Sequence, residues 1–209
     1  MRKFTIFILL ISNFFALTSG LSAQNADIEL LKKINRTAPG LRPVSAFITE
    51  TANPISLAIP IGMGAYSLIS KDKDLFKDAF YVAFSSGVNM GMTELLKRTI
   101  RRERPATTYP GELYIYEIRT DYAMPSGHTS GAFATATALS LKYPEWYVIV
   151  PAYVWASSVG LSRMHLGLHY PSDVLAGAAL GAGSAFITYK INEWLWDNYD
   201  IKGWKIIKK

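Results

Sequence analysis

Residues 125–141 have the sequence PSGHTSGAFATATALSL, a polar turn that leads directly into an apolar stretch. The stretch Gly127–Leu141 lacks the apolar–polar alternation of a strand, and it is long for a strand. Its alanine and leucine residues favour a helix, and proline is common where helices begin. The sequence therefore predicts a helix that starts beside Pro125, with polar side chains gathered at its first turn.

Four further stretches share this apolar character and length: Pro54–Ser70, Ala79–Leu96, Trp146–Leu161 and Val174–Tyr189. A shorter segment, Asp27–Arg36, is amphipathic, so it lies on a membrane surface or over the end of a bundle. Gly177 and Gly181 leave room for close helix packing. We predict an all-α fold, a helical bundle of about five to six helices that is embedded in a membrane.

The membrane prediction has an alternative. The apolar stretches lie at the short end of the roughly 17–25 residues that cross a bilayer. Several of them contain glycine, serine or threonine, and the mean hydropathy of the chain is only +0.14. A soluble helical bundle is therefore the alternative to a membrane-embedded one.

The N-terminus has the composition of a targeting segment. Arg2 and Lys3 precede an apolar run, Phe4–Leu17, and small residues follow that run. This order is typical of a secretory signal. We predict a signal peptide over residues 1–23, or alternatively a first transmembrane helix, followed by a single domain over residues 24–209.

The overall composition excludes several classes of protein. Hydrophobic residues make up 50% of the 209 residues and charged residues 18%, which excludes a disordered chain. Cysteine is absent, so the fold uses neither disulfides nor a thiolate metal site. The formal net charge is +6, and it falls to +4 without residues 1–23, which hold two basic and no acidic residues. Such a mild excess gives no support for nucleic-acid binding.

A basic segment follows the stretch Ala79–Leu96. Lys97 and Arg104 are seven residues apart, so a continuous helix would place them on one face. Pro105 is expected to end that helix. Two cations on one face can hold a phosphate dianion, and an arginine can do so through two parallel hydrogen bonds. For this segment alone, a solvated charge run or a membrane-surface anchor is the alternative.

The turn at residues 125–128 combines features of an anion site with a titratable group. Backbone N–H groups at a helix start favour an anion, and Gly127 lets a ligand approach closely. Ser126 can donate a hydrogen bond, and His128 can transfer a proton near neutral pH. Taken alone, however, an ordinary helix start with a surface histidine fits this turn better.

A third polar segment, residues 162–173, contains an arginine, two histidines and an aspartate. Pro171 is expected to begin a helix, with Asp173 in its first turn. A carboxylate one turn from His169 can fix the tautomer of the ring and leave the other nitrogen free to attack. Arg163 adds a third cation. Helix capping is the alternative role for Asp173.

Together the three segments resemble the PAP2 (type-2 phosphatidic acid phosphatase) superfamily, which also includes bacterial acid phosphatases and vanadium haloperoxidases. Its signature is a Lys, six residues, then Arg-Pro; Pro-Ser-Gly-His; and Ser-Arg, five residues, His, three residues, Asp. All three parts occur here in order and at full spacing, as Lys97 to Arg104-Pro105, Pro125 to His128, and Ser162-Arg163 to His169 to Asp173. The joint match is specific, and it points to the branch of bacterial membrane-associated lipid phosphatases.

The resemblance implies a role for each matching residue. His169 would attack phosphorus and form a phosphohistidine, Asp173 would orient it, and His128 would protonate the leaving oxygen. The phosphoryl oxygens would be held by Lys97, Arg104, Ser126, Gly127 and Arg163. Three fixed cations can do what magnesium does in kinases, so we expect no metal and no other cofactor.

His165 lies outside the signature. With His169 it has the i, i+4 spacing of a metal-binding pair, but neither a third histidine nor an HExxH glutamate accompanies the two. We therefore expect no metal site. The motif G-x-S-x-G is absent around Ser126 and Ser130, which argues against a serine hydrolase.

The expected function is metal-independent hydrolysis of a lipid phosphomonoester or diphosphate. Candidate substrates are undecaprenyl diphosphate, phosphatidic acid, phosphatidylglycerol phosphate and lipid A phosphate. One alternative is a soluble periplasmic acid phosphatase of low specificity, and a second is a non-catalytic lipid-binding membrane protein. Substrate choice is expected to lie in residues 106–124, where Arg119 and several tyrosines could contact a head group. The expected partners are the lipid substrate and membrane lipids, with no nucleic acid and no obligate protein partner.

The charge distribution predicts an orientation. If the N-terminus lies inside the cell, the lysines of residues 71–77 fall on the inner side, in accord with the positive-inside tendency. The loops around residues 97–126 and 162–173 then share the outer side. The three arginines of residues 101–104 break the tendency there, which suggests that they are kept for chemistry. We therefore predict location in the bacterial inner membrane with the active site facing the periplasm; a soluble periplasmic location is the alternative.

Overall fold

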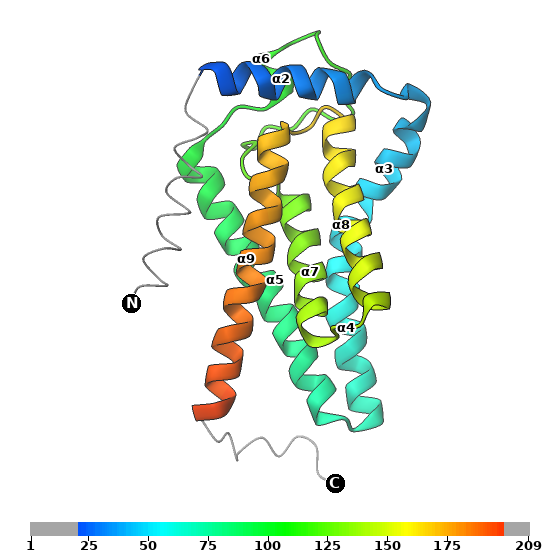
Figure 1. The fold of residues 1–209 in the computed structure, drawn as a ribbon, viewed down its shortest axis with the longest axis vertical. Coiled ribbons are helices and arrows are strands. Elements are labelled where there is room, and N and C mark those ends of the chain that lie inside the picture. Colours follow the sequence, from blue (N-terminus) through cyan, green and yellow to red (C-terminus); the bar gives the residue numbers. More distant parts are fainter. Residues whose placement is uncertain (1–20, 199–209) are drawn as a thin grey trace.

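The computed structural model of the protein describes residues 21–198. These residues form helices and connecting loops, and no strand occurs among them. The predicted all-α fold is therefore confirmed (Figure 1). The signal peptide predicted for residues 1–23 falls mostly on residues 1–20, outside the described part of the chain, so it stays a prediction.

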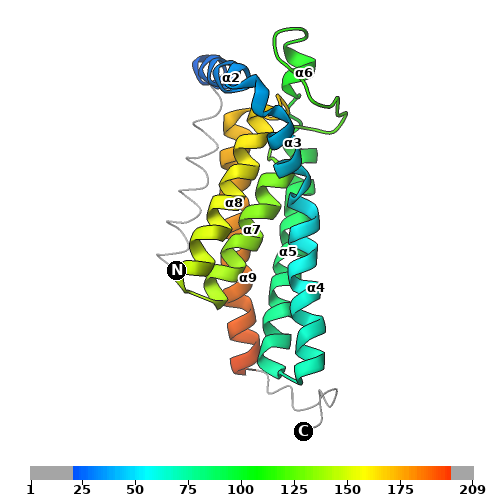
Figure 2. The ribbon, with the colours of Figure 1, turned by 90° about the vertical axis from the view of Figure 1, so that its right-hand side faces the viewer.

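Long helices run side by side and form a bundle (Figure 1, Figure 2). They are α4 (Ala52–Ser70), α5 (Lys73–Ile100), α7 (Gly127–Lys142), α8 (Trp146–His165) and α9 (Pro171–Asn198). Each contains one of the apolar stretches of the sequence, and α5, α8 and α9 extend beyond theirs by a turn or more. At the start of α5, for example, the carboxylate of Asp72 accepts hydrogen bonds from the N–H groups of Asp74 and Leu75.

Shorter helices close one end of this bundle. They are α2 (Leu21–Arg36), the 3-10 helix η1 (Pro39–Leu41), α3 (Arg42–Glu50) and α6 (Pro105–Thr108). α2 lies across the bundle end (Figure 1), where its Leu31 is buried in a cluster with Tyr170. The amide of Asn35 donates to the main-chain carbonyls of Tyr114 and His165, both at 2.9 Å. Of the two positions predicted for the amphipathic segment, the structure shows the one that covers the bundle.

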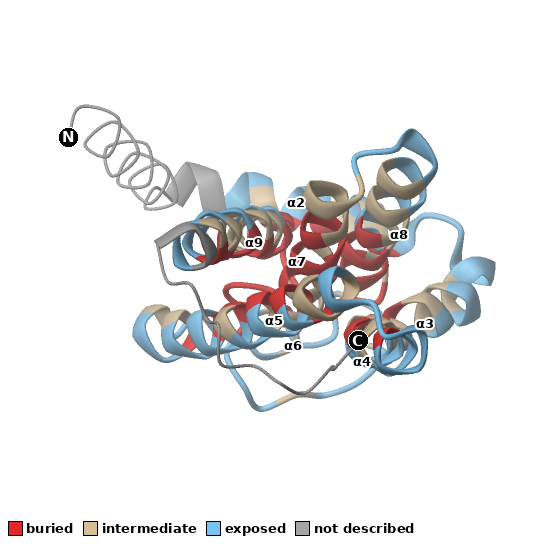
Figure 3. Ribbon diagram, turned by 90° about the horizontal axis from the view of Figure 1, so that it is seen from below, coloured by how far each residue is buried: buried red, intermediate tan, exposed pale blue. Residues whose placement is uncertain are grey.

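α7 lies at the centre, where it packs against α4, α5, α8 and α9 (Figure 3). Its side chains are small, which lets the surrounding helices approach closely. A Cβ atom on Gly177 of α9 would lie 2.6 Å from the carbonyl oxygen of Ser126, and one on Gly181 would lie 2.2 Å from that of Ser130. The packing role predicted for these glycines is confirmed, and it brings the start of α9 against the start of α7.

The exterior of the long helices is strongly apolar. Exposed side chains there include Leu57, Ile61 and Ile69 of α4, Phe80 and Met90 of α5, Val154 of α8, and Leu175 and Phe186 of α9. The segments Pro39–Ser70 and Pro171–Leu195 are long and apolar enough to cross a membrane, with mean hydropathies of 1.2 and 1.4. Only 17% and 33% of the most apolar part of each segment is buried, so most of these side chains face outward. Such an exterior favours membrane association over the soluble alternative.

Candidate active site

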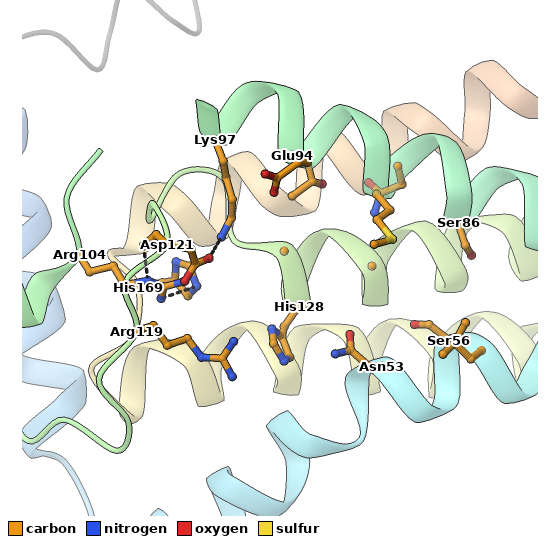
Figure 4. A pocket seen from close by; sticks show the side chains of 16 residues that line it. Asn53, Ser56, Ser86, Glu94, Lys97, Arg104, Arg119, Asp121, His128 and His169 are labelled. Atoms are coloured by element: carbon orange, nitrogen blue, oxygen red, sulfur yellow. Dashed lines mark hydrogen bonds and ion pairs between the residues drawn. The ribbon is translucent and has the colours of Figure 1, made fainter. Parts of the chain in front are cut away.

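The three polar segments of the sequence meet in one cavity, where Lys97, His128 and His169 lie around a common space (Figure 4). The cavity has a volume of about 570 Å³. Its lining includes Lys97, Arg104, Gly127, His128 and His169 from those segments, and Arg119 and Asp121 from the loop between α6 and α7. Side chains of α4 and α5 complete its walls. Segments far apart in the chain therefore build a single site.

The first segment departs from the helical geometry that its spacing predicts. α5 ends at Ile100, and Arg101 has a left-handed backbone (φ 53°) whose N–H donates to the carbonyl of Lys97 at 3.0 Å. Because this turn stops the helix, Arg104 does not share a helical face with Lys97. Pro105 begins α6 rather than ending α5. The helical prediction for this segment is wrong, yet the turn still brings both cations to the cavity.

Lys97 and Arg104 meet at the carboxylate of Asp121. Lys97 Nζ forms an ion pair with Oδ2, and Arg104 Nη2 lies 2.8 Å from Oδ1. Arg104 Nε also donates to the main-chain carbonyl of Asp121 at 2.9 Å. Burial tends to raise the pKa of Asp121, but its bonds to Lys97 and Arg104 outweigh burial and lower that pKa. The two cations predicted to hold phosphate thus already hold an anion.

Arg163 is a buried cation with open hydrogen-bonding capacity. Its side chain is 1% exposed, and Nη1 donates to the hydroxyl of Thr49 at 2.9 Å. Within the described residues, Nε and Nη2 have no hydrogen-bond partner. A buried guanidinium with two open donors is costly unless an anion completes it. Arg163 is therefore suited to hold the oxygens of a phosphate.

The ring of His169 lies between Arg104 and Asp173. Nε2 is 3.2 Å from Arg104 Nη1, and because a guanidinium only donates, Nε2 accepts and carries no proton. The ring proton is then on Nδ1, which lies 3.5 Å from Asp173 Oδ2. No hydrogen bond to Nδ1 is formed by the residues that the structure describes. Contacts of this kind often tighten when a substrate binds, so Asp173 is placed to orient the ring.

The electrostatic surroundings keep His169 neutral. Burial lowers the pKa of His169 well below its ordinary value, and the neighbouring cations Arg163, Arg104 and Lys97 lower it further. The neutral imidazole is the nucleophilic form of histidine. His169 therefore keeps an unprotonated Nε2, which accepts from Arg104, over a wide range of pH.

Asp173 is held by Arg102, a residue to which the sequence assigned no specific role. Arg102 Nη1 donates to Asp173 Oδ1 at 2.8 Å, and Nη2 donates to Asp27 Oδ2 of α2 at 2.6 Å. Asp27 Oδ1 also accepts from the N–H of Ser172 at 2.9 Å. These bonds connect α2 to the first turn of α9. The sequence signal for Arg102 was its position where the positive-inside tendency disfavours arginine.

The second segment places two of its predicted site residues at the cavity. Ser126 precedes α7, and Gly127 and His128 in the first turn line the cavity. Ser126 is fully buried, and its hydroxyl lies 2.9 Å from that of Thr129. Its N–H donates to the carbonyl of Asp173 at 3.0 Å, which joins the starts of α7 and α9. The hydroxyl of Ser126 would have to turn away from Thr129 to hold a phosphoryl oxygen.

His165 does not belong to this cavity. Its Nδ1 lies 2.7 Å from the hydroxyl of Ser45, and its Nε2 lies 2.8 Å from the carbonyl oxygen of Thr37. Within residues 21–198, no three His, Cys, Asp or Glu side chains are grouped so that they could hold a metal ion. The i, i+4 spacing of His165 and His169 therefore does not bring their rings together at one ligand.

The arrangement has the parts that phosphoryl transfer needs. Buried cations can neutralise phosphoryl oxygens, and His169 offers an unprotonated nitrogen. His128 offers a second imidazole at the same cavity, where burial and the neighbouring cations lower its pKa to about 3. Positioning and charge neutralisation are the main contributions of a protein to this reaction.

Comparison with known proteins agrees with this chemistry. An undecaprenyl-diphosphatase from Sulfolobus acidocaldarius is 29% identical over 198 residues, which cover 91% of this chain and 93% of that protein. A lipid A 1-phosphatase from Rhizobium johnstonii is 32% identical over 114 residues, which cover 52% of this chain but only 44% of that protein.

The fold also has a counterpart of known structure. It matches a transmembrane PAP2-type phosphatidylglycerolphosphate phosphatase from Bacillus subtilis with a TM-score of 0.74. That match has 24% identity and covers 93% of this chain and 98% of the other. The sequence profile of the PAP2 superfamily matches residues 78–197, a range that holds all three segments of the site. This chain therefore belongs to the PAP2 superfamily and is a phosphatase.

Proposed function

We propose that this protein hydrolyses a lipid phosphomonoester or diphosphate without a metal ion, through a phosphohistidine at His169. The observation that carries the proposal is the pairing of two buried groups. His169 presents an unprotonated Nε2, and Arg163 leaves two donors open among the described residues. A nucleophile without a proton beside an incomplete anion site is suited to attack on a phosphate.

The proposed first step forms a bond between His169 Nε2 and phosphorus and breaks the bond from phosphorus to the leaving oxygen. His128 gives its proton to that oxygen, and the negative charge of the bound phosphate favours a proton on His128 before the step. Asp173 accepts a hydrogen bond from Nδ1–H and stabilises the ring as positive charge develops.

In the second step, water attacks phosphorus and His128 accepts its proton, which releases phosphate and restores His169. Throughout both steps the phosphoryl oxygens are held by Lys97, Arg104, Arg163, the Gly127 N–H and the Ser126 hydroxyl. These fixed positive groups take the place of a metal ion.

A lipid substrate is supported by the position of the cavity. Leu57 and Met90 line it and are 61% and 75% exposed, so the cavity reaches the apolar exterior between α4 and α5. The names of the relatives agree, since they include phosphatases of undecaprenyl diphosphate and of lipid A. Arg119, which also lines the cavity (Figure 4), is suited to contact a charged head group. The substrate class is thus one of the lipid phosphates named above rather than a small soluble ester.

The orientation in the bacterial inner membrane is part of the proposal. The lysines of residues 71–77 lie around the turn between α4 and α5, at the end of the bundle away from α2 (Figure 1), and Lys142 pairs with Asp78 of α5 at 2.9 Å. The positive-inside tendency then puts the cavity on the periplasmic side. We also propose that residues 24–209 act as one domain, because Asp27 and Asn35 bond α2 to the bundle.

The two alternatives make different demands on the site. A lipid-binding protein without activity has no need for an unprotonated nitrogen beside open arginine donors. A soluble acid phosphatase has no need for an apolar exterior. All proposed site residues come from one chain, so the proposal requires no protein partner.

The test is phosphate release by detergent-purified protein in excess EDTA, with lipid phosphates and water-soluble phosphates side by side. We expect release from lipid phosphates that persists in EDTA and is lost in His169→Ala. Equal or faster turnover of soluble phosphates would favour the acid phosphatase instead. No release from any substrate by folded protein would overturn the proposed activity.

A further inference from the structure

The phosphate site has two walls that differ in how they are filled. We call Lys97 and Arg104 the outer wall. His169, together with the buried Arg163 that does not itself line the cavity, is the inner wall. In the inner wall, Nε and Nη2 of Arg163 have no hydrogen-bond partner among the described residues. The outer wall is bonded to the carboxylate of Asp121, which contributes one oxygen to each cation. The protein's own carboxylate therefore stands where two phosphoryl oxygens would bind.

A carboxylate and a phosphate compete directly for such a wall. Both present pairs of oxygens that a guanidinium or an ammonium group can hold. If a phosphate dianion took its place between Lys97 and Arg104 while Asp121 stayed, like charges would lie within a few ångströms of each other, which is strongly unfavourable. Occupation by Asp121 and occupation by phosphate are thus alternatives.

Burial shows which partner can move. The side chains of Lys97 and Arg104 are 9% and 4% exposed, whereas 48% of the Asp121 side chain is exposed. Lys97 is fixed on α5, and Asp121 lies on the loop between α6 and α7. The carboxylate can therefore leave toward solvent while the two cations stay in place.

We propose that Asp121 is a specificity-determining residue: its carboxylate holds the outer wall until a group that carries two negative charges displaces it. This inference rests on the proposed function of the same site. A terminal phosphate monoester or diphosphate brings enough charge to take over both cations. A phosphodiester carries one negative charge, the same as the carboxylate that it would replace, and gains nothing by the exchange.

The membrane setting gives this selection a purpose. Phosphodiester lipids surround a membrane-associated site in large excess and carry a phosphate group of similar size. Asp121 keeps them from occupying the cations as inhibitors. If a ligand binds only after Asp121 has left, its apparent affinity is reduced in proportion to the fraction of sites that Asp121 has left. A dianion offsets this loss through its stronger attraction to Lys97 and Arg104, whereas a monoanion does not.

The test compares Asp121→Asn with the wild type and with a matched control, Glu112→Gln. Glu112 lies on the same loop, is also 48% exposed and also pairs with a lysine, Lys32, but it is not part of the cavity lining. Turnover of a lipid phosphomonoester is measured in detergent micelles that contain increasing fractions of phosphatidylglycerol, a phosphodiester. Binding of inorganic phosphate to each protein is measured by calorimetry.

We expect Asp121→Asn to bind inorganic phosphate about tenfold more tightly than the wild type. We also expect phosphatidylglycerol to inhibit Asp121→Asn, while the wild type and Glu112→Gln are little affected. Equal or weaker phosphate binding by Asp121→Asn would overturn the inference, because it would show that the carboxylate only positions the two cations. Equal inhibition of all three proteins by phosphatidylglycerol would also overturn it.

A measurement on the wild type covers the case in which Asp121→Asn does not fold. Water-soluble carbodiimide labels accessible carboxylates, and mass spectrometry gives the labelling of Asp121 and Glu112. Tungstate, a tetrahedral dianion, should raise the labelling of Asp121 and leave that of Glu112 unchanged; unchanged or lower labelling of Asp121 would overturn the inference. If the wild type turned over no lipid phosphate, the proposed function would fail, while phosphate binding would still decide the role of Asp121.

Discussion

Two histidines four residues apart lie in opposite surroundings. Both ring nitrogens of His165 have partners, the Ser45 hydroxyl at 2.7 Å and the Thr37 carbonyl at 2.8 Å. His169 lies in the short connection between α8 and α9. Its Nδ1 has no hydrogen bond among the described residues, and its Nε2 lies 3.2 Å from Arg104 Nη1. The first ring connects α8 to the segments around α3, and the second faces a cavity.

The difference shows how hydrogen-bond satisfaction separates structural from chemical roles. Buried polar atoms normally have partners, so an open one needs a ligand to explain it. The arginines repeat the contrast: Arg102 bonds to the carboxylates of Asp27 and Asp173, whereas Nε and Nη2 of Arg163 find no partner in residues 21–198. Arg102 thus holds together the elements around the site, and Arg163 keeps donors that a phosphate could use.

Among changes that test the difference between His169 and His165, Asp173→Asn should have the largest effect. The amide lacks the charge that stabilises the His169 ring and favours the wrong tautomer, so kcat should fall by about 10³–10⁴. The measurement is phosphate release from a lipid phosphate at saturating substrate. Asp27→Asn is the matched control, since Asp27 bonds the same arginine without facing the ring, and it should cost far less. A fall of less than tenfold in Asp173→Asn would show that the ring needs no orienting carboxylate.

The open donors of Arg163 are tested by Arg163→Lys. Lysine keeps the charge but cannot present the fork of Nε and Nη2, so kcat/KM should fall by about 10²–10³. The control is Arg98→Lys, because Arg98 is 75% exposed and does not line the cavity, although its partner Glu94 does. Full activity of Arg163→Lys would mean that charge alone suffices at the inner wall.

The satisfied histidine should affect stability rather than chemistry. His165→Ala removes the bonds to Ser45 and Thr37 and should lower the free energy of unfolding by about 1–3 kcal/mol. The value of kcat should stay within about twofold of the wild type. Unfolding and turnover are both measured in detergent. A folded His165→Ala protein that has lost its activity would break the comparison between the two histidines.

A smaller effect concerns pH. Because the pKa of His169 is held well below 6.5, the unfolded chain takes up a proton as the pH falls through about 6.5 and the folded protein does not. The stability tied to neutral His169 is therefore complete above that pH and declines below it, by about 1 kcal/mol at pH 5.5. His169→Asn should lose less stability than the wild type between pH 7.5 and 5.5, measured by thermal unfolding. Equal losses in the two proteins would show that the ring is protonated in the fold.

The sequence predicted the helices well because their pattern is local. Each apolar stretch became a long helix, and Pro171 begins α9 with Asp173 in its first turn, as predicted. Close packing at Gly177 and Gly181 also followed from side-chain size alone, although the sequence did not indicate that α7 is the partner. These features depend on composition and spacing over one or two turns.

Prediction from the sequence failed where the backbone conformation depends on a single residue, or where a contact joins residues far apart in the chain. The seven-residue spacing of Lys97 and Arg104 fits a helical face, but the left-handed turn at Arg101 ends the helix between them. Arginine has no special preference for that conformation, so nothing local signalled it. Asp121 and Asp27 reach the site across 24 and 75 residues of chain, as seen in their bonds to Lys97 and Arg102, and no spacing rule covers such contacts.

The central claim is that His169 carries the phosphoryl group, and trapping the phosphorylated protein tests it most directly. The enzyme is quenched at alkaline pH during turnover of a lipid phosphate, and the modified residue is located by mass spectrometry. We predict a phosphoryl group on His169 in the wild type and in His165→Ala, and none in His169→Ala. A phosphoryl group on another residue, or turnover by His169→Ala at a rate near that of the wild type, would contradict the account.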